Sequence, residues 1–202
     1  MKNNNSTSFI LAVTGGLACG KSEVGRFLEE MGFLVCDTDF LAHDLMKKGG
    51  SVYSAVLDCF GTDILDERGE ISRPTLGALV FKDSKKREAL NQLVHPVIEA
   101  IIKEWILEQR KKGGKSAVLV PLLFESGMDR LDWDLILCVA SDPESVFQRL
   151  AKRGLNRDDA VARIDAQMSL EEKERRSDCV LHNVSNLEDL KNSLYDLLDN
   201  IK

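Results

Sequence analysis

The chain has 202 residues, of which 44% are hydrophobic and 30% are charged, and its formal net charge is −6. This composition predicts one globular domain spanning 1–202, and the acidic balance argues against nucleic-acid binding, which requires a basic face. The apolar run Phe9–Val13 is too short for a signal-peptide core or a membrane span. The five cysteines are dispersed and lack CxxC spacing, which predicts neither a disulfide framework nor a zinc site. We therefore expect a cytoplasmic protein without a membrane partner, either a monomer or a weak homo-oligomer.

Apolar segments and helical patterns alternate along the chain. The expected strands are Phe9–Thr14, Phe33–Cys36, Ala117–Val120, Leu135–Val139 and Cys179–His182. The expected helices follow the first strand to about Met31, fill most of 40–109 with starts near Arg73, Asp83 and His95-Pro96, separate the later strands, and close the chain from Leu187. Apolar strands separated by helices predict a parallel sheet covered on both faces. The long helical stretch after the second strand predicts a small helical lobe beside the carboxyl edge of the sheet.

A glycine-rich loop follows the first strand and fits the pattern GxxxxGK[ST] without a mismatch. Its residues are Gly15, Gly16, Leu17, Ala18, Cys19, Gly20, Lys21 and Ser22. The glycines let successive backbone N–H groups point at phosphate oxygens, Lys21 neutralises the β- and γ-phosphates, and the Ser22 hydroxyl binds Mg²⁺. The helix that follows directs its positive end to the same place. The sequence therefore predicts a loop that binds ATP and Mg²⁺.

The remaining sequence narrows the class of nucleotide-binding protein. The chain has no NKxD-type segment for reading guanine, which disfavours a GTPase. The third strand does not end in an acid, since Glu125 follows Val120 only after several residues, and this disfavours a mechanical ATPase. A kinase for a small molecule is the favoured interpretation. A regulatory module that binds a nucleotide without acceptor chemistry is the alternative.

Two acids, Asp37 and Asp39, directly follow the second expected strand, which we expect beside the strand that carries the loop. A carboxylate at the carboxyl end of a strand can accept the proton of a hydroxyl that attacks the γ-phosphate. Strand alternation sends the two side chains to opposite faces, so one of them should point into the site. The spacing does not say which, and either residue can instead cap the next helix.

Arg149 and Arg153 lie four residues apart on an expected helix that begins near Pro143, so they should share a face. Guanidinium groups stabilise the negative charge that spreads over the transferred phosphoryl group. In kinases such groups are often carried by a mobile lid that closes over ATP. A run of charges is more often only a solvated helix face, but beside this loop a catalytic role is favoured for both.

Several further segments occur in a characteristic order. They are Thr14–Ser22, Asp37–Asp39 with Ala42, Arg73 with Leu76 and Phe81, Leu93–Pro96, Pro121–Glu125, Gln148–Arg153, Ala166-Gln167, Ser177-Asp178 and Val180–Asn183. In this order they resemble the bacterial dephospho-CoA kinase family over nearly the whole chain. Many families share the loop, whereas the Asp-x-Asp, His-Pro and Pro-Leu-Leu-Phe-Glu segments together are far more specific.

The resemblance implies an α/β fold of the P-loop NTPase type, similar to nucleoside-monophosphate kinases. It implies a three-layer α/β/α core over 1–40 and 112–202, a helical CoA-binding lobe over about 41–111 and a lid over about 142–168. The implied reaction is ATP-dependent phosphorylation of the ribose 3′-hydroxyl of dephospho-CoA, the last step of coenzyme A synthesis.

The resemblance also implies roles for individual residues. Asp39 rather than Asp37 would be the general base, and Lys21, Arg149 and Arg153 would stabilise the transition state. Residues on the acceptor side would be Arg73, His95, Pro121, Leu122 and Glu125. Asn183 would approach the adenine of ATP, and Glu23 would complete the nucleotide-binding segment after Ser22.

Three departures from the family pattern affect these expectations. His43 stands where the family usually has Arg, which would weaken a contact there or make it pH-dependent. Ser185 stands where Gly is common, which affects the adenine contact. Cys19 and Glu23 vary the loop, although Cys19 is expected to act mainly through its backbone N–H. A kinase for another nucleotide or metabolite is the alternative enzyme.

Overall fold

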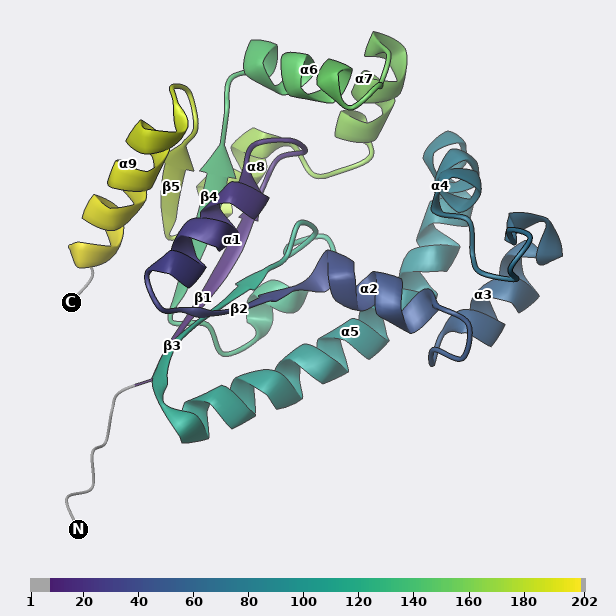
Figure 1. Ribbon diagram of the computed structural model, residues 1–202, viewed down its shortest axis with the longest axis horizontal. Coiled ribbons are helices and arrows are strands. Elements are labelled where there is room, and N and C mark those ends of the chain that lie inside the picture. The colour runs from purple at the N-terminus through teal and green to yellow at the C-terminus, as the bar shows by residue number, and fades with distance from the viewer. Residues whose placement is uncertain (1–7, 201–202) are drawn as a thin grey trace. The chain divides into compact units, whose positions relative to one another are not determined.

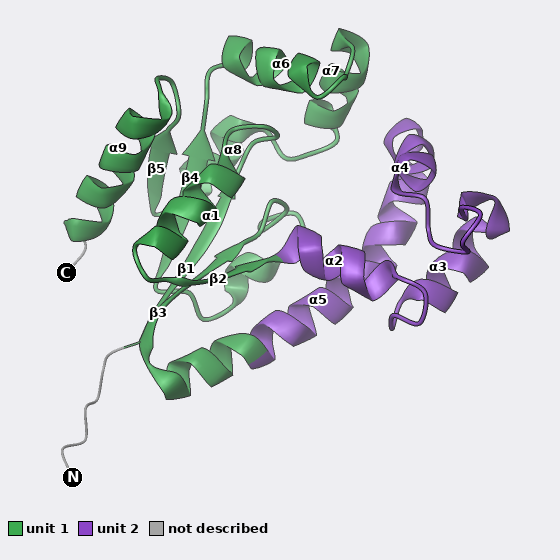
Figure 2. Cartoon of the chain, viewed as in Figure 1, with its two compact units in different colours: residues 1–37, 105–202 green, residues 38–104 purple. Residues whose placement is uncertain are grey.

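The computed structural model describes residues 8–200, and the chain forms two compact units (Figure 2). Unit 1 comprises Met1–Asp37 and Trp105–Lys202, and unit 2 comprises Thr38–Glu104. The sequence placed the helical lobe at about 41–111. The chain enters unit 2 where the second strand ends, and it returns to unit 1 inside the helix α5 (Ser84–Lys112). The helix continues through this second boundary, between Glu104 and Trp105, because the first glycine after it is Gly113.

The centre of unit 1 is a parallel sheet (Figure 1). Its strands are β1 (Ser8–Gly15), β2 (Leu34–Asp37), β3 (Gly114–Leu119), β4 (Leu135–Ala140) and β5 (Cys179–His182). The order is β2-β3-β1-β4-β5, and each neighbouring pair is parallel. The expected parallel α/β fold is confirmed. The central position of β1 puts the loop that follows it in the middle of the carboxyl edge.

The expectation that the second strand lies beside the first is wrong, because β3 lies between β2 and β1. β2 has four residues and, over residues 8–200, pairs only with β3, so it forms an edge of the described sheet. Its Leu34 side chain is 52% exposed. A short, partly solvent-exposed strand is typical of a sheet edge, because one side of an edge strand has no neighbouring strand to cover it.

Helices cover both faces of this sheet. On one face, alternate residues such as Leu11, Val13, Leu137 and Val139 form a core with α1 (Lys21–Glu30), α6 (Pro143–Lys152) and α9 (Leu187–Asp199). α8 (Leu170–Arg176) also contacts β1 and β4. Figure 1 shows α1 in front of the strands and α8 behind them. The result is the three-layer arrangement that two-sided burial of the strands requires.

Polar caps set the starts of the later helices in unit 1. The capping residues are Asp142 for α6, Asn156 for α7 (Arg157–Asp165), Ser169 for α8 and Asn186 for α9. Each side-chain oxygen accepts the backbone N–H three residues further on, at 2.8–3.2 Å. The short 3₁₀ helix η2 (Met128–Arg130) lies between β3 and β4.

Unit 2 consists of α2 (Thr38–Met46), α3 (Tyr53–Phe60), the 3₁₀ helix η1 (Thr62–Ile64), α4 (Arg73–Lys82) and the first part of α5. A turn over 66–70 precedes α4. Asp66 Oδ1 accepts the N–H groups of Arg68 and Glu70, both at 2.9 Å, and Leu65 and Ile71 close the turn as an antiparallel bridge. Ser72 caps α4, whose first turn contains Pro74.

The expectation that His95-Pro96 opens a new helix is wrong, because Pro96 lies inside the continuous helix α5. Proline removes one backbone hydrogen bond from a helix interior. Val94, Ile98, Ile102 and Ile106 recur every four residues across this site and are 0–5% exposed, so burial of one apolar face outweighs the local cost. Among the helices described over 8–200, none has the combination of length and apolar character needed to cross a membrane.

Candidate active site

The loop between β1 and α1 has the conformation that phosphate binding requires. Gly15 and Gly20 have φ values of 139° and 110°, and Ala18 has φ 57°, all in the region that L side chains rarely adopt. Within residues 8–200, the N–H groups of Leu17, Ala18 and Gly20 donate to no protein acceptor. A curled stretch whose amides point away from the protein's own carbonyls is a nest for an anion.

Two of the loop glycines are required by close neighbours. A Cβ on Gly15 would collide with the backbone carbonyl of Val139 in β4. A Cβ on Gly20 would collide with the Asn183 side-chain amide. Both positions also have positive φ, so any other residue would be strained there even without a neighbour.

Lys21 and Ser22 occupy the first turn of α1. The Lys21 Nζ donates to the carbonyls of Gly15, at 3.0 Å, and Gly16, at 2.7 Å, so its ammonium is held over the first half of the loop. Ser22, the next residue, is exposed. This places a cation and a hard oxygen donor at the N-terminal end of a helix, where anions are favoured.

The carboxyl ends of β4 and β5 support the loop from behind. Asn183 is 4% exposed, and its Nδ2 donates to the Cys19 carbonyl at 2.9 Å. Arg149 of α6 donates to the Ala18 carbonyl and to Ser141 Oγ, both at 3.1 Å, and to the Asn183 carbonyl at 3.3 Å. These contacts hold two loop carbonyls from outside, which keeps the neighbouring N–H groups directed inward. The structure thus brings the predicted residues Arg149 and Asn183 to the loop itself.

Burial also changes the chemistry of the loop thiol. Cys19 is 1% exposed, and desolvation raises the pKa of its thiol above the ordinary value, against the smaller opposing effect of Lys21. Cys19 is therefore a poor thiolate at neutral pH and acts in the loop through its backbone.

The other predicted catalytic residues have different positions. Arg153 is the C-cap of α6, directly after Lys152, and it is exposed; its shared helix face with Arg149 stays a prediction. Asp37 is the last residue of β2, and Asp39 lies in the first turn of α2. The alternation argument for these acids is wrong, because the strand ends at Asp37 and a helix begins at Thr38.

The segment Pro121–Glu125 follows β3 and is tied to α8. The Pro121 carbonyl accepts Lys173 Nζ at 2.7 Å and Thr14 Oγ1 at 3.4 Å. Glu125 Oε1 accepts the same Lys173 Nζ at 2.9 Å. Lys173 is fully buried. Sequence reasoning missed it because it stands in the charged run LEEKERR, where nothing marks one lysine as buried.

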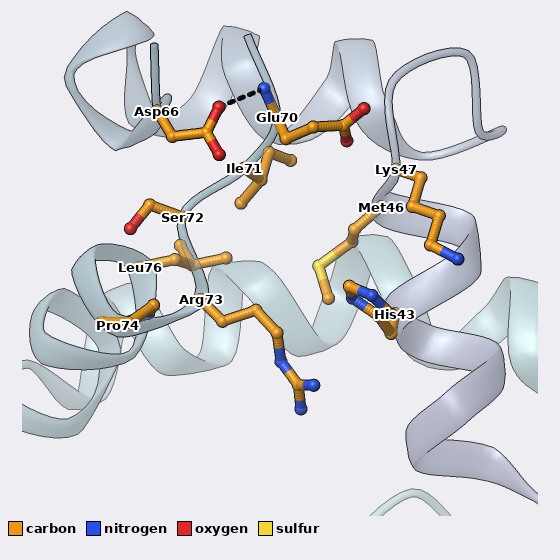
Figure 3. A pocket seen from close by; sticks show the side chains of 10 residues that line it. All are labelled: His43, Met46, Lys47, Asp66, Glu70, Ile71, Ser72, Arg73, Pro74 and Leu76. Atoms are coloured by element: carbon orange, nitrogen blue, oxygen red, sulfur yellow. Dashed lines mark hydrogen bonds between the residues drawn. The ribbon is translucent and has the colours of Figure 1, made fainter. Parts of the chain in front are cut away.

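Unit 2 contains a pocket of about 430 Å³ (Figure 3). Its lining residues are His43, Met46, Lys47, Asp66, Glu70, Ile71, Ser72, Arg73, Pro74 and Leu76. Figure 3 shows the Arg73 and Met46 side chains extending into the space between α2 and the start of α4. The predicted acceptor residue Arg73 is thus in a pocket with His43, whereas His95, half-buried in α5, does not line it.

The pocket joins basic side chains, carboxylates and an apolar floor, so it suits a ligand with both anionic and apolar parts. The sequence marked His43 only as a departure from a pattern, and no spacing rule connects it to Arg73. Among residues 8–200, no group of three or more His, Cys, Asp or Glu side chains is arranged to hold a metal ion.

Comparisons with known proteins agree with this fold and loop. The family profile described as dephospho-CoA kinase matches residues 9–189. A dephospho-CoA kinase of Lactobacillus johnsonii is 41% identical over 196 residues, covering 96% of this chain and 98% of the relative. One from Carboxydothermus hydrogenoformans is 38% identical over 194 residues, covering 96% and 94%.

Comparison with solved structures agrees with the sequence comparisons. A crystal structure from Thermus thermophilus has a TM-score of 0.76 at 32% identity, covering 96% of this chain and 98% of that one. A dephospho-CoA kinase from Campylobacter jejuni has a TM-score of 0.68 at 26% identity, covering 95% and 96%. A shikimate kinase from Acinetobacter baumannii, 12% identical with a TM-score of 0.56, shares the fold.

The parallel sheet, the GxxxxGKS loop and the helix that follows it define a kinase of the P-loop class. Within that class the match is specific over nearly the whole length. The chain belongs to the dephospho-CoA kinase family.

Proposed function

We propose that the chain transfers the γ-phosphoryl group of ATP to the ribose 3′-hydroxyl of dephospho-CoA and so completes coenzyme A synthesis. The observation that carries this proposal is the loop Gly15–Ser22, whose inward N–H groups are set for a polyphosphate, in a chain that matches one kinase family from residue 9 to residue 189. Phosphoryl transfer needs little covalent chemistry from the protein, so a positioned loop and charges account for most of catalysis.

The proposed reaction is an in-line attack of the acceptor hydroxyl on the γ-phosphorus. Asp39 orients the hydroxyl and accepts its proton, and Lys21 moves from the loop carbonyls to the β- and γ-phosphates. Arg149 adds positive charge beside the loop through the guanidinium that holds the Ala18 carbonyl, and Arg153, at the exposed end of α6, approaches the transferred group from the lid at about 142–168. Charge that develops on the phosphoryl oxygens is stabilised by these groups.

The chain fits a magnesium ion that arrives with the nucleotide. Mg²⁺ prefers oxygen ligands and usually takes phosphate oxygens and waters with only one or two protein groups. Ser22, an exposed residue in the first turn of α1, has one hydroxyl and is the residue proposed to hold the ion. When bound, Mg²⁺ neutralises charge between the β- and γ-phosphates.

The remaining nucleotide contacts are proposed at the ends of the loop. The Asn183 backbone and the residues that follow β5 would meet the adenine, since the Asn183 side chain already holds the Cys19 carbonyl. Gly16 and Leu17 contribute backbone to the phosphate nest. Glu23, which the loop leads into, bonds to Arg26 at 2.9 Å and would support the start of α1.

For the acceptor we propose the unit 2 pocket, with Arg73 as the main cationic contact and His43 beside it. A guanidinium suits the phosphate-bearing part of dephospho-CoA, and the apolar floor suits its less polar parts. His95 of the helical lobe and Pro121, Leu122 and Glu125 of unit 1 are proposed to belong to the acceptor side as well.

The direct test is incubation of the chain with ATP, Mg²⁺ and dephospho-CoA, with coenzyme A detected by mass and by co-elution with the authentic compound. We expect one ADP per coenzyme A, and no product with Lys21→Ala. A panel of other hydroxyl acceptors, assayed for ADP release, separates this function from that of another small-molecule kinase. Tight ATP binding without ADP formation on any acceptor would instead indicate a nucleotide-binding module.

A further inference from the structure

Lys173 is a fully buried cation in unit 1 that the proposed chemistry does not use. Its side chain is 0% exposed, in a helix whose other charged residues are exposed or half-buried. Its Nζ donates to the Pro121 carbonyl at 2.7 Å and pairs with Glu125 Oε1 at 2.9 Å. Two acceptors from one segment, the one directly after β3, therefore meet a single ammonium group.

The Glu125 carboxylate extends this contact to a third segment. Its Oε1 also accepts the backbone N–H of Met168 at 2.9 Å. Met168 lies between α7, which ends at Asp165, and α8, which begins at Leu170. The chain that returns from the arginine-bearing segment is thus fastened to the segment after β3 through one carboxylate. We call Lys173, Glu125, the Pro121 carbonyl and the Met168 N–H the buried clamp.

The buried clamp lies next to the phosphate loop. Thr14, the residue before Gly15, is fully buried, and its Oγ1 reaches the same Pro121 carbonyl at 3.4 Å. Leu170, three residues before Lys173, packs against Gly16, since a Cβ on Gly16 would lie 3.5 Å from Leu170 Cδ1. A shift of α8 would therefore move both the loop and the segment after β3.

The polar contacts of the buried clamp are better suited to fixing the orientation of its groups than to stabilising the fold. Removing an ammonium group from water is costly, and a well-packed apolar residue of similar volume is often as stabilising as a buried ion pair. An ion pair with further hydrogen bonds, however, fixes the direction of each partner, whereas apolar contacts do not. Both Pro121 and Glu125 belong to the proposed acceptor side, where misplacement by about 1 Å can slow a reaction about a hundredfold.

We propose that Lys173 is a positioning residue, which holds Glu125 and the Pro121 carbonyl in place and fastens the end of the arginine-bearing segment to the acceptor side. This inference rests on the proposed function for its effect on turnover. The clamp as a physical link is independent of the substrate and is measured without one.

Hydrogen exchange at the Met168 amide tests the link in the ligand-free protein. We expect this amide to exchange at least tenfold faster in Lys173→Met, because the Glu125 carboxylate loses the cation that fixes it. Glu125→Gln keeps an acceptor for Met168 but loses the charge, so we expect a smaller acceleration. Unchanged exchange at Met168 in both variants would overturn the clamp.

Kinetics test the positioning role. We expect Lys173→Met to lower kcat/KM for dephospho-CoA at least tenfold, with a higher acceptor KM, while the Kd for ADP changes less than threefold. Lys173→Arg should recover part of the loss. The double variant Lys173→Met/Glu125→Gln should be no worse than Lys173→Met alone, because both changes break the same contact.

The matched control is Arg175→Met, which removes a cation from the same helix. Arg175 pairs with Glu172 at 2.7 Å on the surface and is 72% exposed, so we expect wild-type kinetics and exchange. If Lys173→Met does not fold, Glu125→Gln carries the test. Wild-type KM and kcat per folded molecule in Glu125→Gln and in any folded Lys173→Met would overturn the positioning role. If the wild-type chain forms no coenzyme A, only the proposed function is contradicted, because the exchange experiment uses no substrate.

Discussion

The phosphate loop, Gly15–Ser22, and the pocket of unit 2 differ in the atoms that they present. The loop presents backbone N–H groups, held inward by positive φ angles and by outside contacts from Arg149 and Asn183. The pocket presents side chains, chiefly His43 of α2, Lys47 directly after it, and Arg73 at the start of α4. The geometry of a site made of backbone groups depends on the conformation of the chain, so it is determined by glycine positions and by packing. A site made of side chains depends on residue identity, so it can change by single substitutions without loss of fold.

The largest expected effect concerns Asp39, the proposed general base, which lies outside the loop. Asp39→Asn removes the proposed base and leaves the loop unchanged, so we expect turnover to fall by about 10²–10⁴-fold with nearly unchanged ATP affinity. Asp37→Asn is the matched control at the end of β2 and should cost far less. Steady-state kinetics and nucleotide titration measure both variants. The reverse ranking would assign the base to Asp37.

The next effect tests whether conformation controls the loop. Gly20→Ala forces a Cβ into positive φ, at about 1–2 kcal/mol of strain, and against the buried Asn183 amide. We expect a lower melting temperature and at least tenfold weaker ADP binding. Gly32→Ala has φ 82° with nothing within 4 Å of the new Cβ, so it should show the strain alone. Equal losses in both variants would mean that the Asn183 contact has no role.

A smaller effect is expected in the pocket. Arg73→Ala removes one guanidinium contact to the acceptor, commonly about 1.5–3 kcal/mol for a charged hydrogen bond. We expect the acceptor KM to rise about tenfold or more, with the ATP KM and the melting temperature nearly unchanged. Arg68→Ala, at an exposed turn of the same unit and outside the pocket, is the control. A change in the ATP KM without a change in the acceptor KM would contradict the proposed pocket.

The smallest effect contrasts the thiol of the loop with an exposed thiol of unit 2 outside the pocket. Burial raises the pKa of Cys19 in the loop, so at pH 8 it has less thiolate than an ordinary cysteine. Cys59 in α3 is exposed. We expect iodoacetamide to modify Cys59 first, as followed by peptide mass, and the Cys19 rate to keep increasing above pH 9. Faster modification of Cys19 at pH 8 would indicate that the loop opens readily.

This difference also explains what could be predicted from the sequence. The loop and the five strands are local patterns, in which glycine spacing and apolar runs determine the backbone, and both were found. The place of β3 between β1 and β2 was missed because sheet order is set by long-range packing. Pro96 was misread because its local cost is overcome by an apolar face that extends to both sides. Lys173 was not identified, and His43 was marked only as a departure from the family pattern, since the neighbours of both residues are fixed only when distant segments meet.

The bonds of Lys21 to the Gly15 and Gly16 carbonyls have a consequence for selectivity. A ligand that draws the ammonium away must offer more than two neutral oxygens, and the charged oxygens of a polyphosphate tail would do so. Adenosine, which has no phosphate, would leave the lysine where it is and forfeit its charge. The two carbonyls thus compete with the nucleotide for Lys21. A nucleotide must offer enough negative charge to displace them before it gains the contact with the ammonium group.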